Sequence, residues 1–506
     1  MPPGTGRRSP RCSCPRRRGR GDSFAVTERR DPALLPAREQ ARRIRAGALS
    51  ATDLLRACLA RVERHNGELN AVVTLNPHAE AEAAAVDASL AADEDPGPLA
   101  GLVVGIKDVT ETAGLRTTYG SPLFAGHVPR EDALVVRRLR EAGAVVLGKT
   151  NTPEFAAGGN TWNEVFGVTR NPWNPALSAG GSTGGGAVAL ATGMISLAQG
   201  TDLGGSLRIP ASFCGVAGLR PTPGLVPTVP AAYLWDDLQA TGLMARDPED
   251  IAFGLRAIAG PDPASPVSAP EPLRDDSGAA PLSGSRWAYA GDIARIGIDA
   301  GVEAACREML ASLRAGGAQV DETDLDLSYA RDAFLVLRGH WFVSHFEAEL
   351  HRIDAFGPNV SANLRSGMAL TPTDIGAAEN VRRRVREELL ELLDPYDALL
   401  TPCMAIPPFP VEQNYPETVG GRPMETYVDW IAPTFLLSMP GLPVACVPAG
   451  LDAAGLPVGL QVVGHPRGEE QALAVATAIS RVRPLCLPRL GRAFTGPRLR
   501  HRESRG

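Results

Sequence analysis

Short apolar runs alternate with helical patterns along most of this chain. The runs at Leu102–Ile106 and Ala144–Leu147 have the length and composition of buried strands, and Asp132–Glu141 between them has a helical pattern. Apolar residues also repeat at helical spacing over Leu54–Val62, after an N-cap signal at Ser50. Such alternation predicts an α/β fold built in layers.

The same alternation returns towards the end of the sequence. Residues 260–285 are rich in Pro, Ser and Gly, which predicts a surface linker. After it we expect strands at Arg286–Ala290, Val444–Val447 and Val458–Val463, and helices at Val302–Leu313 and Glu470–Ile479.

Residues 168–226 are dominated by Gly, Ser, Thr and Pro, and only Ala187–Met194 has a regular pattern. A stretch of this length inside a domain is usually either disordered or functional. Apolar residues such as Ile209 and Phe213 argue against disorder. We therefore expect a folded site built largely from backbone.

Composition excludes several classes of protein. The net charge is −6 with 21% charged residues, which gives no indication of a nucleic-acid partner. No run of 18 uncharged apolar residues occurs, so we expect no membrane span. The eight cysteines lack a zinc spacing and predict reduced thiols in a cytoplasmic protein, with no metal site; they are Cys12, Cys14, Cys58, Cys214, Cys306, Cys403, Cys446 and Cys486.

The first 24 residues carry seven arginines among Pro, Gly and Ser. A secretory signal would require an apolar segment after them, and none follows. Residues 1–28 are expected to be a disordered extension, or the product of a start site placed too early. A basic arm for an acidic partner is the alternative. Residues 491–506 are expected to be a flexible tail.

Lysine is nearly absent from the chain. Of 51 basic residues only Lys107 and Lys149 are lysines, and the other 49 are arginines. A nucleotide bias explains an excess of arginine. However, lysine can lose its proton when buried and arginine cannot. The two lysines are therefore candidates for a site that needs a neutral amine.

Two sequence matches to known motifs are not supported by their context. Gly143–Thr150 fits the P-loop pattern G-x-x-x-x-G-K-[ST], but its middle residues predict a buried strand, and Pro153 would block the helix that a P-loop needs. Gly180–Gly184 fits the nucleophile elbow G-x-S-x-G, but no strand is predicted before it and no histidine has a recognisable site context.

Two glycine clusters, Gly180–Gly186 and Gly204–Pro210, each contain a serine. Flanking glycines let the backbone turn tightly and present N–H groups to a ligand. A serine needs a base to become a nucleophile, and a desolvated neutral Lys107 is a suitable one. Glycine-rich loops that serve only as turns remain an alternative at this point.

Several long motifs, in order, resemble those of the amidase signature enzymes. They are Leu102–Asp108, Leu147–Phe155, Ala179–Ser182, Gly200–Ala211 and Gly218–Thr222, followed by Gly441–Pro443 and Gly455–Gln461. The resemblance covers residues 30 to 485. It implies one large α/β domain, over 29–490, with a central mixed sheet flanked by helices on both sides. It also implies a catalytic Gly/Ser-rich core at about 70–260 and a variable pocket wall at about 300–435.

The resemblance also assigns roles to residues. Ser206 matches the nucleophile, Ser182 matches a bridging serine that follows a cis peptide bond, and Lys107 matches the base. Oxyanion-binding N–H groups are expected from Leu203, Gly204, Gly205 and Ser206. Gly181, Thr183, Asp202 and Arg208 are expected to support the loops, and Thr183 stands where the family often has a second serine. No cofactor is expected.

The predicted function is hydrolysis of a carboxylic amide, at a linear non-peptide C–N bond, through an acyl-enzyme on Ser206. The 11 aromatics within 334–435 suggest small apolar or aryl amides. The alternatives are a glutamine amidase subunit of a tRNA-dependent amidotransferase complex, a P-loop ATPase, and an inactive scaffold, which the filled catalytic positions disfavour. By resemblance we expect a homodimer that binds a small-molecule amide.

Overall fold

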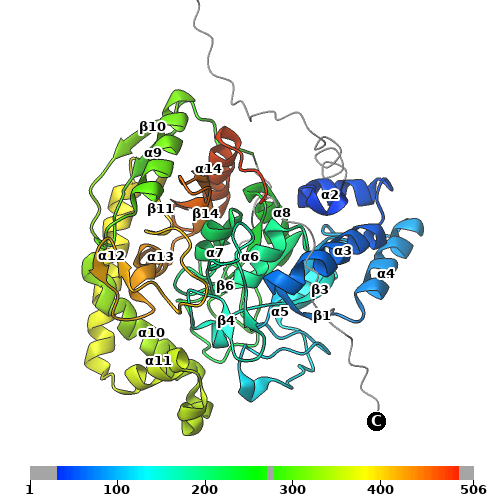
Figure 1. Ribbon diagram of the computed structural model, residues 1–506, viewed down its shortest axis with the longest axis horizontal. Helices are drawn as coiled ribbons and strands as arrows, with labels where there is room; N and C mark the ends of the chain where they lie inside the picture. The colour runs from blue at the N-terminus through cyan, green and yellow to red at the C-terminus, as the bar shows by residue number, and fades with distance from the viewer. Residues whose placement is uncertain (1–30, 270–272, 274–277, 489, 491–506) are drawn as a thin grey trace, which may run out of the picture.

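A computed structural model describes residues 31–269, 273, 278–488 and 490 of the chain. Its main feature is a large sheet that runs through the molecule (Figure 1). In spatial order the eleven strands of this sheet in the described residues are β1 (Val72–Leu75), β3 (Val145–Thr150), β2 (Val103–Lys107), β6 (Leu197–Asp202), β8 (Ala240–Ala245), β7 (Ala217–Arg220), β14 (Val444–Leu451), β15 (Pro457–Val463), β11 (Ala398–Pro402), β9 (Arg286–Tyr289) and β10 (Gln319–Glu322).

The sheet is mixed. Strand β2 is parallel to both of its neighbours, β3 and β6. From β6 to β11 each neighbouring pair is antiparallel, and β11, β9 and β10 are again parallel. Because β2 and β6 run side by side in one direction, their carboxyl ends, at Lys107 and Asp202, meet at the same edge of the sheet.

Helices flank this sheet on both sides, which confirms the predicted fold class (Figure 1). In Figure 1, α3 and α4 lie at the β1 end of the sheet, and α9 and α12 lie towards the opposite end. The α-helices with these labels are α2 (Ala37–Arg45), α3 (Ala51–Leu69), α4 (Ala79–Ala91), α5 (Leu134–Glu141), α6 (Gly184–Ala191), α7 (Arg208–Cys214), α8 (Pro248–Ile258), α9 (Ala300–Ala315), α10 (Arg331–His345), α11 (Pro358–Met368), α12 (Pro372–Leu393), α13 (Ala432–Ser438) and α14 (Glu469–Val482).

The strands and helices predicted outside the glycine-rich region are confirmed. Helix α3 begins after Ser50, whose side chain accepts a hydrogen bond from the N–H of Asp53 at 2.9 Å. Helices α9 and α14 and strands β14 and β15 include the predicted segments, and β9 ends at Tyr289, one residue before the predicted end. The described part of 260–285 contains no helix or strand, in agreement with the predicted linker.

The prediction for 168–226 was wrong in one respect, because this region contains more regular structure than its pattern indicated. It holds α6, β6, α7 and β7, and every residue of these elements is buried. An element that is buried on all sides has no polar face, so its sequence shows neither the helical nor the strand period. Pro210 did not prevent α7 because it occupies the first turn, where a helix tolerates proline.

The P-loop motif is not a loop. Residues 145–150 form the buried strand β3, as the sequence predicted, and no α-helix follows directly. The side chain of Lys149 is buried and donates hydrogen bonds to the carbonyl of Thr110 and, at 2.8 Å, to Oγ1 of Thr112. Among the described residues no strand directly precedes Gly180. The G-x-S-x-G motif at 180–184 therefore lacks the strand that a nucleophile elbow must follow.

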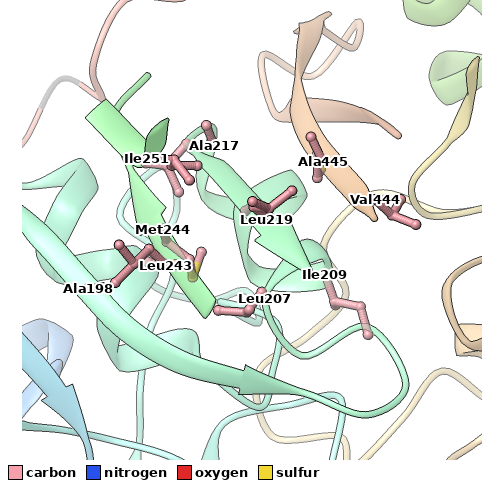
Figure 2. Packing of buried hydrophobic residues seen from close by; sticks show 14 of the residues in the cluster. Ala198, Leu207, Ile209, Ala217, Leu219, Leu243, Met244, Ile251, Val444 and Ala445 are labelled. Atoms are coloured by element: carbon pink, nitrogen blue, oxygen red, sulfur yellow. The ribbon is translucent and has the colours of Figure 1, made fainter. Parts of the chain in front are cut away.

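A buried apolar cluster lies beneath the strand ends where the glycine clusters meet the sheet (Figure 2). Leu207 and Ile209, which flank Arg208 at the start of α7, are both buried. Leu207 lies near Leu243 of a neighbouring strand, whereas Ile209 points to the other side (Figure 2). These two side chains anchor the turn that carries Ser206, since moving the turn would expose them to water.

Other predictions concern composition. Six cysteines lie in the described residues, and all six are free thiols. Within those residues no helix has the length and apolarity needed to cross a membrane, and no group of His, Cys, Asp and Glu side chains is arranged to hold a metal ion. The predicted extension at 1–28 and the tail at 491–506 lie outside the described residues.

Candidate active site

Lys107 is the last residue of β2, and its side chain is fully buried. Its Nζ lies 2.6 Å from Oγ of Ser182 and 3.1 Å from Oγ1 of Thr201, and the carbonyl oxygen of Thr201 is 3.5 Å away. The backbone N–H of Lys107 donates to the side-chain oxygen of Gln199 in β6. Three oxygen atoms, none from a carboxylate, therefore surround the amine.

Burial lowers the pKa of Lys107 from its ordinary value of 10.5 to about 7. The negative charge of Asp202 acts in the opposite direction and raises this pKa, but burial outweighs it. A substantial fraction of the amine is then neutral at neutral pH, and a neutral amine has a lone pair that can accept a proton.

Ser182 follows a cis peptide bond from Gly181, and its side chain is buried. The chain around it passes through a space too narrow for side chains. A Cβ atom on Gly181 would lie 2.8 Å from the carbonyl oxygen of Gly158, and one on Gly185 would lie 2.3 Å from the backbone nitrogen of Asn151. Real Cβ atoms do not approach backbone this closely, so the glycines are required by packing.

Ser206 lies in the turn between β6 and α7, and it is the one partly exposed member of the predicted triad. The N–H of Thr183 donates to the carbonyl oxygen of Ser206 at 3.1 Å. This hydrogen bond holds residue 206 beside the residue that follows Ser182. The structure thus brings together all three predicted residues, from β2, from the loop before α6 and from the turn after β6.

The turn at 203–206 presents backbone N–H groups. Those of Leu203, Gly204 and Ser206 donate to no other group in the described part of the chain. That of Gly205 donates to the carboxylate of Asp202 at 2.8 Å, so it is already engaged. Gly205 has φ +124°, and a Cβ there would lie 2.3 Å from Oγ1 of Thr434, which explains the glycine.

Asp202 stabilises this turn from beneath. Its carboxylate accepts hydrogen bonds from the N–H groups of Gly205 and Leu207 and from the guanidinium of Arg208 at 2.9 and 3.0 Å. Arg220 lies 3.7 Å from the same carboxylate. Burial alone would raise the pKa of Asp202, but the charges of Arg208 and Arg220 and the hydrogen bonds hold it at about 2.

The two arginines connect this turn to the C-terminal half of the chain. Arg208 donates to the carbonyl of Thr434, to Oγ of Ser438 and, at 2.8 Å, to Oε1 of Gln461. Arg220 donates to the carbonyls of Asp202, Leu238 and Ser438. Arg220 and Gln461 both lie within motifs quoted for the family resemblance, but their position in the sequence gave no indication of these contacts.

The side chain of Thr183 makes no hydrogen bond to Lys107. Its hydroxyl is buried without a hydrogen-bond partner in the described residues, and it faces Gly200, where a Cβ would lie 2.8 Å from Oγ1. Besides Ser182, the second hydroxyl next to the amine belongs to Thr201, which the sequence analysis did not single out.

Aromatic side chains lie behind the turn. A Cβ on Gly204 would be 3.3 Å from Cζ of Phe334 and 3.6 Å from Phe435, and these two rings stack with centroids 4.1 Å apart. Both rings are fully buried, so they form the support of the turn and part of the core.

Comparison with known proteins gives a consistent result. The family model described as Amidase matches residues 53–473. An acylamidase of Rhodococcus erythropolis is 34% identical and aligns with 89% of this chain and 96% of its own. A glutamyl-tRNA(Gln) amidotransferase subunit of Carboxydothermus hydrogenoformans is 35% identical, over 83% of this chain and 91% of its own.

A solved structure agrees with these sequence matches. A bacterial aryl acylamidase of the amidase signature enzymes superposes with a TM-score of 0.83 at 25% identity, over 89% of this chain and 97% of its own. The chain therefore belongs to the amidase signature family, whose enzymes are hydrolases that act on C–N bonds.

The carboxylate of Asp202 is expected to be essential for stability. Asp202→Asn leaves two buried arginines without their counter-charge, and breaking a buried ion pair by removing one partner costs about 3–5 kcal/mol. The free energy of unfolding, measured by urea denaturation and circular dichroism, should fall by about that amount.

The matched control is Asp321→Asn, which breaks a half-exposed ion pair with Arg286 at 3.0 Å. Its expected cost is less than about 1 kcal/mol. If both variants unfold at the urea concentration of the original chain, Asp202 is not the support described here.

Proposed function

We propose that the chain hydrolyses a carboxylic amide through an acyl-enzyme on Ser206, with Ser182 and Lys107 as the proton relay. The observation that carries this proposal is the 2.6 Å contact between a buried amine with a lowered pKa and the hydroxyl of Ser182, which lies beside the turn that bears Ser206. Family membership supports it independently.

In the first half of the proposed reaction, Oγ of Ser206 attacks the amide carbonyl. Its proton passes to Oγ of Ser182, and the proton of Ser182 passes to neutral Lys107. When the tetrahedral intermediate collapses, the proton returns from Lys107 through Ser182 to the departing nitrogen. Ammonia or an amine leaves, and the acyl group remains on Ser206.

In the second half, water attacks the acyl-enzyme. The same relay takes a proton from the water and returns it to Oγ of Ser206, which releases the carboxylic acid. In both halves the relay first takes a proton from the nucleophile and then returns it to the leaving group, so a single base with a pKa near neutrality serves both.

Negative charge on the carbonyl oxygen would be stabilised by the turn after β6. The N–H groups of Leu203, Gly204 and Ser206 support this role because they have no other acceptor among the described residues. Since Gly205 donates to Asp202, we assign it to holding the shape of the turn. Donors already fixed in place need no reorganisation as the charge develops.

An apolar or aryl amide, with a linear non-peptide bond, is the proposed substrate class. The names of two similar proteins, an acylamidase and an aryl acylamidase, favour it. The alternative is a glutamine amidase subunit of an amidotransferase complex, which the similarity to the glutamyl-tRNA(Gln) amidotransferase protein favours. Because the sequence identities of the acylamidase and the amidotransferase protein differ by one percentage point, substrate tests must decide.

The relay predicts a specific pattern of inactive variants. Ser206→Ala should lose labelling by a fluorophosphonate and lower kcat by roughly four orders of magnitude or more. Lys107→Arg should be nearly inactive because a guanidinium stays protonated. In the original chain kcat/KM should rise with pH through about 7, since the amine is neutral above its lowered pKa.

The control is Ser366→Ala, at an exposed serine of α11, which should retain full activity. High activity of Lys107→Arg would show that the base is not a neutral Lys107.

The substrate class can be tested with a panel of anilides, aliphatic amides and glutamine, with Ser206→Ala as the blank. We expect higher kcat/KM on anilides and apolar amides than on glutamine, measured by product release. Hydrolysis of glutamine alone, together with a stable complex with an ATP-binding partner in gel filtration, would instead identify a component of an amidotransferase.

A further inference from the structure

We propose that Thr201 is a positioning residue, which turns the lone pair of the neutral Lys107 amine towards Ser182. The inference rests on the proposed function, because it concerns how the base of that reaction is oriented. Its basis is the set of oxygen atoms around Nζ, two of which come from this one threonine.

A neutral primary amine has two N–H groups and one lone pair, and it rotates freely unless its neighbours fix it. The carbonyl oxygen of Thr201, at 3.5 Å, can only accept a hydrogen bond, so an N–H must point to it. The hydroxyl of Thr201, at 3.1 Å, accepts the other N–H. The lone pair is then left facing Ser182 at 2.6 Å, the direction from which the proton arrives.

The same three oxygens also serve the protonated amine. After proton transfer the ammonium has three N–H groups, and the carbonyl of Thr201, the hydroxyl of Thr201 and Oγ of Ser182 each accept one. Every N–H of the amine therefore has an acceptor in either state, as a buried donor requires. The amine can gain and lose its proton without rotating or moving.

Thr201 is held rigidly enough for this role. It lies in β6, where it pairs with Thr241 of β8, and it is 8% exposed. Side chains alternate along a strand, so Gln199 and Thr201 project to the same side of β6. Gln199 accepts the backbone N–H of Lys107 while Thr201 contacts its amine, so both ends of the lysine are fixed against one strand.

The test compares Thr201→Val, which keeps the shape but removes the hydroxyl, with Thr201→Ser, which keeps the hydroxyl. The matched control is Thr241→Val, at the paired position in β8, where the hydroxyl contacts Thr228 at 3.2 Å. For each variant kcat, KM and the pH profile of kcat/KM are measured on an anilide, and circular dichroism checks the fold.

Thr201→Val should lower kcat by roughly tenfold, the effect of losing about one hydrogen bond to an amine, with KM unchanged. The acidic limb of its profile should move to lower pH, because the ammonium loses an acceptor while the charge of Asp202 stays in place. Thr201→Ser should keep most of the activity, and Thr241→Val should match the original chain. If Thr201→Val does not fold, Thr201→Ala removes the same hydroxyl and carries the same expectation.

Two results would overturn the role of Thr201. One is a folded Thr201→Val with the original kcat and the original acidic limb, and the other is a Thr201→Ser as impaired as Thr201→Val. Both leave the proposed function intact if the original chain hydrolyses the anilide and Ser206→Ala does not. An active Ser206→Ala would overturn the proposed function itself.

Discussion

Removal of the Lys107 amine from water is the constraint on which the rest of the site depends. Burial lowers its pKa to about 7, and the nearby carboxylate of Asp202 opposes this change. That carboxylate is itself bound by Arg208 and Arg220 and does not contact the amine. A carboxylate in direct contact with Nζ would favour the ammonium, which has no lone pair to accept a proton. The buried arginines therefore hold the turn and also satisfy the nearest negative charge.

The high glycine content follows from the same close packing. Enclosing the amine and two hydroxyls requires backbone segments from different parts of the chain to lie in contact, with no side chains between them. A Cβ on Gly181 or Gly185 would collide with backbone at 158 or 151, and one on Gly205 would collide with Thr434. Glycine loses more conformational entropy on folding than other residues do. The burial of Leu207 and Ile209 helps to offset this cost.

Sequence reasoning predicted the fold class, and it singled out residues that the structure places close together, because each left a local signal. Strands such as β2 and β3 are continuous apolar runs, and Lys107 stood out in a chain that otherwise uses arginine. The elements β6 and α7 were missed because total burial removes the polar face that creates a period. The roles of Thr201, Arg220 and Gln461 depend on contacts between strands distant in sequence, and no local pattern encodes such contacts.

The ionisation of Lys107 is the central claim, and it can be measured directly because the chain has only two lysines. Labelling with [ε-¹³C]lysine should give two side-chain NMR signals, and the signal that disappears in Lys107→Met belongs to Lys107. The account predicts that this signal titrates with a midpoint at about 7, and that of Lys149 at about 8. A Lys107 signal that stays in its protonated form until the pH approaches the ordinary lysine value of 10.5 would contradict the account.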